Sequence, residues 1–101
     1  MENISMSQER IETQHPTRSR GSVVNKAKYE QVRQSIENCL ASGDMTLKEL
    51  SACVIRELRD KFDGRLPWYV ETVELDLEVK GVVERKIGTR PLLISLLKND
   101  P

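Results

Sequence analysis

The chain has 101 residues, with 16 Lys plus Arg against 16 Asp plus Glu, so its formal net charge is zero. This length allows one small domain, and the balanced charge argues against a dedicated nucleic-acid-binding protein, which usually carries a basic excess. Aromatic residues make up 4% of the chain, which is too few for a surface on which bases stack.

The composition of residues 1–23 predicts a disordered N-terminal tail. Apolar residues are sparse in this range, and Gln, Glu, Ser, Thr and Arg dominate, so the segment cannot bury enough surface to offset its ordering entropy. Arg18 and Arg20 would suit a basic arm that enters a DNA minor groove, although the tail is neutral overall. Because the sequence has neither the apolar segment of a signal peptide nor a membrane-spanning run, we expect a cytoplasmic protein.

A first helix is expected over residues 25–41. Asn25 is suited to cap its N-terminus, and Gly43 is suited to end it in a left-handed conformation. Apolar residues then recur with helical spacing and define one buried stripe. Its members are Tyr29, Val32, Ile36, Cys39 and Leu40.

A second helix is expected to begin at Thr46. Thr46 followed by Glu49 fits the capping box, in which each side chain binds the backbone N–H of the other residue. Apolar residues again form a stripe, with Cys53 and Ile55 beside it. The stripe consists of Leu47, Leu50, Val54 and Leu58.

Cys39 and Cys53 both lie in expected helices. We interpret them as small core residues that stay reduced, as is usual in the cytoplasm. Together with the single His15 they are too few to ligate a metal. The sequence therefore predicts no metal and no cofactor.

A third helix is expected from Pro67 to Lys80, with Pro at its first turn and Gly81 after its end. Spacing of 100° per residue divides it into three faces. The core face contains Tyr69, Val70, Val73 and Leu77, the solvated face contains Glu71, Glu74 and Glu78, and a second apolar face contains Trp68, Thr72, Leu75 and Val79.

After Gly81 the pattern changes to that of a β-hairpin, with strands over residues 82–87 and 92–97 and a turn over residues 88–91. In the second strand Leu92, Ile94 and Leu96 share one face by alternation. Leu93 and Leu97 must then point outward.

This order of elements resembles a winged-helix domain. Thr46-Leu47-Lys48-Glu49-Leu50 and Leu75-x-Leu77-Glu78-x-x-Gly81-Val82-Val83-Glu84-Arg85 carry the resemblance. The stretch from Trp68 to Glu78, with Gly88-x-Arg90-Pro91, also looks like a small uncharacterised bacterial family of such domains. The resemblance implies an α+β fold, with three helices followed by a C-terminal β-hairpin wing, over residues 24–98.

Winged helices that bind DNA place the third helix in the major groove, and this chain departs from their usual charge. Residues 62–81 contain five acidic and two basic residues, whereas residues 82–101 contain four basic and two acidic residues. Phosphate attraction dominates DNA affinity, so DNA contact would have to come from the wing through Arg85, Lys86 and Arg90. Ordinary solvated charges that protect the hairpin edge are the simpler interpretation.

The sequence has no catalytic constellation and no Gly-rich phosphate loop, and we expect a protein that is not an enzyme. Two functions stay open. The first is a protein-interaction or dimerisation module, which would use the outward apolar residues Trp68, Leu75, Val79, Leu93 and Leu97. The alternative is a DNA-binding transcriptional regulator, which would use Arg18, Arg20, Arg85, Lys86 and Arg90.

Overall fold

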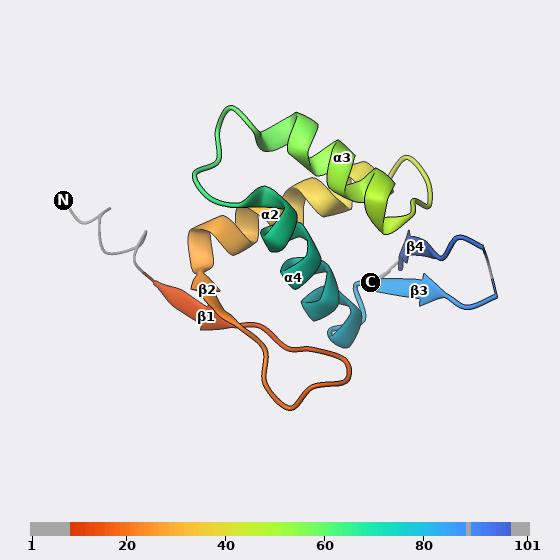
Figure 1. Cartoon of the computed structure of the whole chain (residues 1–101), viewed down its shortest axis with the longest axis horizontal. Coiled ribbons are helices and arrows are strands. Elements are labelled where there is room, and N and C mark those ends of the chain that lie inside the picture. The colour runs from red at the N-terminus through yellow and green to blue at the C-terminus, as the bar shows by residue number, and fades with distance from the viewer. Residues whose placement is uncertain (1–8, 89, 98–101) are drawn as a thin grey trace.

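The computed structural model describes residues 9–88 and 90–97 and has an α+β fold with three helices and two small antiparallel strand pairs (Figure 1). The elements in chain order are β1 (Arg10–Glu12), β2 (Val23–Asn25), α2 (Lys26–Leu40), α3 (Leu47–Leu58), α4 (Leu66–Val79), β3 (Val83–Lys86) and β4 (Leu93–Leu96). The three predicted helices and the C-terminal hairpin are confirmed, and their bounds differ from the prediction by a few residues. None of the helices in the described ranges is long and apolar enough to cross a membrane.

The helix starts follow from their capping residues. Asn25 Oδ1 accepts a hydrogen bond of 3.0 Å from the backbone N–H of Lys28 at the start of α2. At the start of α3, Thr46 Oγ1 accepts from the N–H of Glu49 at 3.1 Å, and Glu49 Oε1 accepts from the N–H of Thr46 at 3.0 Å. Pro67 lies in the first turn of α4, where its missing N–H costs no hydrogen bond. These predicted signals are confirmed.

The core lies where α2, α3 and α4 pack against one another. The predicted stripes of α2 and α3 and the core face of α4 meet there, and each Val, Leu or Ile buried in this way contributes roughly 1.5–3 kcal/mol. The apolar side chains with no exposed surface are Val32, Ile36, Leu50, Val54, Val70, Val73 and Leu77.

A disulfide joins Cys39 of α2 to Cys53 of α3 across a Cα–Cα distance of 6.2 Å. The expectation that both cysteines stay reduced is wrong for this structure. The buried stripe of α2 turns Cys39 toward α3, and Cys53 lies beside the stripe of α3 that faces back. Helix packing therefore brings the two thiols together, and the disulfide reinforces the contact between these helices.

The N-terminal segment is part of the domain, so the predicted tail over residues 1–23 is wrong for residues 9–23. Residues 10–12 of β1 pair with β2, and Ile11 lies opposite Val24, which is buried. The backbone N–H of Thr13 then donates to the carbonyl of Ser22 at 2.8 Å and closes the loop between the strands. The strand pair is short and has few apolar residues. Its contacts with the helices bury Val24 and so hold it in place. Residues 1–8 lie outside the described residues.

The C-terminal hairpin is attached to the helices at two places. Val83 and Ile94 are buried at the base of the hairpin. Ile94 also exchanges two backbone hydrogen bonds with Met45, of 3.1 and 2.7 Å, in the segment between α2 and α3. Leu96 is half-buried, but Leu92 is exposed beside the turn and does not share the inward position predicted for it. The predicted domain end at residue 98 lies outside the described residues.

Candidate functional site

The acidic face predicted for α4 is not uniformly solvated. Glu71 is exposed and Glu78 is half-buried, but Glu74 is fully buried, so the solvated position predicted for it is wrong. Arg85 of β3 covers it, with Nη2 3.3 Å from Glu74 Oε1 and 2.8 Å from Glu78 Oε2. Glu74 Oε2 has no hydrogen-bond partner among the described residues.

This environment favours the protonated form of Glu74. Burial is the main cause, and the neighbouring carboxylate of Glu78 acts in the same direction. Together they raise the pKa of Glu74 to about 8, although Arg85 opposes the shift. The carboxyl group therefore contributes little negative charge to the surface of α4 at neutral pH.

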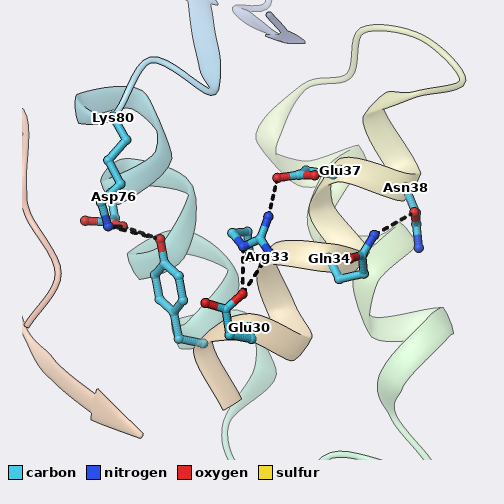
Figure 2. Close-up of polar contacts among 8 residues, drawn as sticks. Glu30, Arg33, Gln34, Glu37, Asn38, Asp76 and Lys80 are labelled. Carbon is cyan, nitrogen blue, oxygen red and sulfur yellow. Dashed lines mark hydrogen bonds and ion pairs between the residues drawn. The ribbon is translucent and has the colours of Figure 1, made fainter. Parts of the chain in front are cut away.

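Asp76 is a second buried carboxylate of α4, and it fastens α4 to α2 and to the N-terminal hairpin. Figure 2 shows Asp76 beside Lys80. The hydroxyl of Tyr29 and the ammonium of Lys80 both donate to Oδ2, the latter at 2.6 Å. The backbone N–H of Gln14 donates to Oδ1 at 2.8 Å. Burial and the hydrogen bond to Asp76 both raise the pKa of Tyr29. With both oxygens engaged, Asp76 has a structural role.

The second apolar face of α4 is partly covered. Trp68 and Val79 are 40% and 41% exposed, but Leu75 between them is half-buried. Trp68 and Leu75 line a hollow of about 220 Å³ together with the loop between β1 and β2. Leu93 and Leu97 are half-buried at β4, and neither of them lines a hollow with Trp68. The five predicted partner-binding residues thus lie on two parts of the chain, α4 and the segment from β4 to Leu97, and three of them are half-buried.

A more continuous surface lies between α3 and the start of α4, and we name it the α3–α4 groove. It consists of two adjoining hollows, of about 650 and 670 Å³, that share Ile55 and Pro67. Leu47 lies at one end and Trp68 at the other. Ile55 is half-buried, and Ala52 in the first hollow is exposed. The groove thus combines the exposed Ala52 with the half-buried Leu47 and Ile55 of α3, and Pro67 and Trp68 of α4 complete its apolar lining.

The groove was not predicted from the sequence, because for the second helix only the buried stripe was considered. Lys48, Ala52, Ile55 and Arg59 recur at i, i+4, i+7 and i+11, which places them along one side of a helix. The same placement that divided the third helix into faces would have identified this second stripe. Only the structure shows that α4 lies beside this stripe and forms the other wall of the groove.

The residues predicted for DNA contact are separated in space and partly engaged. Arg85 pairs with two glutamates of α4, and Lys86 pairs with Asp44 at 2.9 Å. Arg90 is exposed beside the hairpin turn, whereas Arg18 and Arg20 are exposed in the loop between β1 and β2. The structure therefore does not gather them into one basic surface.

The described residues contain one group with the spacing of a metal site, formed by Cys39, Cys53 and Glu57, whose ligand atoms lie within 4.8 Å of one another. The two sulfur atoms are bonded to each other, so they are not thiolate ligands in this state. His15 lies apart from this group, in the loop between β1 and β2. Its Nδ1 accepts from the backbone N–H of Thr17 at 3.1 Å.

The chain belongs to a family of unknown function, DUF6958, whose model matches residues 10–94. The match begins where β1 begins and extends into β4. The family domain therefore includes the N-terminal strand pair as well as the helices and the hairpin. No curated protein and no solved structure matches the chain.

Proposed function

We propose that the protein is a non-enzymatic winged-helix module that binds a helical segment of another protein in the α3–α4 groove. The order of three helices and a C-terminal antiparallel hairpin supports the winged-helix part of this proposal. The backbone bonds between Met45 and Ile94 support it too, because they hold the hairpin beside the start of α3. The N-terminal strand pair is an addition to that arrangement.

The continuity of the groove is the observation that carries the interaction function. Exposed apolar surface of this kind is typical of partner-binding sites. Trp is enriched among the residues that dominate binding energy, and Trp68 lies at the end of the groove with 40% of its surface exposed. Pro67 and Ile55 connect it to the rest of the groove, so a partner that covers Trp68 can bury both hollows.

The length of the groove favours a helix as the bound segment. At a rise of about 1.5 Å per residue, the part of α3 from Leu47 to Arg59 spans about 18 Å, which equals roughly three helical turns. A helix of that length presents apolar side chains at i, i+3 or i+4, i+7 and i+11 along one side, over about 16 Å. Such a pattern places one anchor near Trp68, one over Ile55 and one near Leu47.

DNA binding has less support. Contact between the wing and phosphate would compete with the ion pairs that Arg85 and Lys86 already make with acidic side chains. Arg90, Arg18 and Arg20 are exposed but lie on two different loops. These contacts therefore favour an interaction module over a DNA-binding protein. The experiment below includes a result that would indicate DNA binding instead.

The test is a selection of binding peptides from a random displayed library, carried out on the intact protein. We expect helical amphipathic peptides to be enriched and to shift the fluorescence of Trp68 to shorter wavelengths, since Trp68 is the single Trp of the chain. Ala52→Glu places a charge in the groove at an exposed position and should abolish binding. Ala27→Glu makes the same change at an exposed position of α2 outside the groove, and it should leave binding intact.

Three results would contradict the proposal. Enrichment that is equal for the native protein and Ala52→Glu would show that peptides bind elsewhere. Loss of binding in a Val79→Glu variant alone would assign the function to the opposite side of α4. Salt-sensitive binding of random duplex DNA that disappears in an Arg85/Lys86/Arg90→Ala variant would favour the DNA-binding alternative.

A further inference from the structure

We infer that the helix bound in the α3–α4 groove is acidic, with Asp or Glu side chains near both of its ends and apolar side chains between them. This inference rests on the function proposed above. It adds the chemical class of the partner, which follows from the position and the pairing of the charged residues around the groove.

The groove is basic although the chain is neutral overall. Lys48, Arg59 and Arg65 line it, and among the described residues Glu71 is the only acidic one that does. The formal charge of its lining is therefore +2, against zero for the whole chain. Because complementary charge steers encounter and selects partners, this imbalance favours an acidic segment over a basic one.

The basic residues lie at the two ends of the apolar surface. Lys48 lines the hollow near Leu47, whereas Arg59 and Arg65 line the hollow that ends at Trp68. Lys48 and Arg59 are 11 residues apart in sequence, which corresponds to about 16 Å along α3, on nearly the same side of the helix. A bound helix that carries carboxylates about three turns apart can meet both ends at once.

These three cations are not used within the part of the chain that the structure describes. Elsewhere in residues 9–88 and 90–97, Lys26 and Arg33 of α2, Lys80 at the end of α4 and Arg85 of β3 make ion pairs with acidic neighbours. Lys48, Arg59 and Arg65 make no ion pair with another described residue. A partner carboxylate would therefore gain their attraction without breaking an existing pair, in contrast to a phosphate at Arg85.

Two designed helical peptides without Trp test the inference. Both carry the same apolar side chains, and their flanking positions are Glu in one peptide and Lys in the other. With the full chain at low ionic strength, we expect Trp68 fluorescence to report about tenfold tighter binding of the Glu peptide, since several exposed pairs act together. Added salt should reduce this preference, because it screens exposed charges.

Charge reversal provides the control. A Lys48→Glu, Arg59→Glu, Arg65→Glu variant should prefer the Lys peptide. An Arg10→Glu, Arg20→Glu, Arg90→Glu variant changes the net charge by the same amount at exposed positions outside the groove, and it should keep the preference for the Glu peptide. Circular dichroism establishes that each variant keeps its helices. If a triple variant does not fold, the three single charge reversals are measured in its place.

The outcomes separate the two proposals. If neither peptide binds, the interaction function itself fails. If both bind equally, or if the Lys peptide binds more tightly, the groove binds helices but the acidic partner is wrong. Self-association in sedimentation that Ala52→Glu abolishes would identify a second copy of this chain as the occupant, and would also overturn the inference.

Discussion

Replacing Glu74 by Gln should remove a loss of stability that the native protein undergoes as pH rises. Glu74 is fully buried, its Oε2 has no partner among the described residues, and Glu78 lies beside it. Its pKa in the folded protein is about 8, against an ordinary value of 4.5. Gln has almost the same shape and stays neutral at every pH, so the substitution changes charge far more than packing.

The sign of the effect follows from proton binding. Between pH 4.5 and about 8 the folded chain keeps the proton of Glu74, whereas the unfolded chain releases it. Stability therefore falls as pH rises through this window. Because a tenfold difference in proton affinity corresponds to about 1.4 kcal/mol, the native protein should lose up to about 5 kcal/mol between pH 4.5 and pH 8. Local rearrangement around the ionised carboxylate reduces this to an expected loss of about 2–4 kcal/mol.

Urea unfolding at a series of pH values between 5 and 9 measures the effect. The free energy of unfolding of Glu74→Gln should change less with pH than that of the native protein, and the two should diverge most above pH 8. Glu71→Gln, at an exposed position of the same helix, controls for the loss of one acidic residue. Parallel pH curves for the native protein and Glu74→Gln would refute the reasoning, because they would mean that Glu74 ionises in the fold without cost.

Three further predictions concern the contacts that hold the elements together. Reduction of the disulfide between Cys39 and Cys53, which are 14 residues apart, should lower the unfolding free energy by about 3 kcal/mol, as measured by urea unfolding with and without dithiothreitol. Asp76→Asn should lower it by about 2–3 kcal/mol, because hydrogen bonds to a charged group are lost, and amide exchange in the β1–β2 loop should become faster. Gly21→Ala would place Cβ 1.9 Å from the carbonyl oxygen of Thr13, so nuclear magnetic resonance should show the loop displaced while the helices keep their native shifts.

Local signals account for the part of the fold that the sequence predicts correctly. Asn25 and the Thr46–Glu49 capping box act within one helical turn, and the apolar stripes depend only on helical spacing. These features define α2 and α3 before any tertiary contact is known. The change of period after Gly81 similarly locates the hairpin.

The errors concern features that depend on distant parts of the chain. Glu74 lies close in sequence to Glu71 and Glu78, but Arg85 approaches it from β3, 11 residues later in the chain, and covers it. The strand at residues 10–12 has a single apolar residue, Ile11, and its position depends on β2 and α4. Nor could the spacing of Cys39 and Cys53 reveal that their helices face each other.

The candidate site was predicted in part for the same reason. Exposure of Trp68 and Val79 follows from the faces of a single helix, and the structure agrees with it. The cover over Leu75 comes from the β1–β2 loop, and the groove comes from two helices side by side. A surface formed by several elements needs their arrangement, which helical spacing alone does not provide.

The bond between the backbone of Gln14 and Asp76 also bears on how the chain acquires its fold. It joins residues that are 62 positions apart, so it raises the contact order of a domain whose helix starts are set locally. Long-range contacts of this kind slow folding, because a large loop must close before they contribute energy. During synthesis from the N-terminus, the β1–β2 loop precedes its anchor and can dock only after α4 has emerged. The β1–β2 loop is therefore among the last parts of the domain to reach its final position.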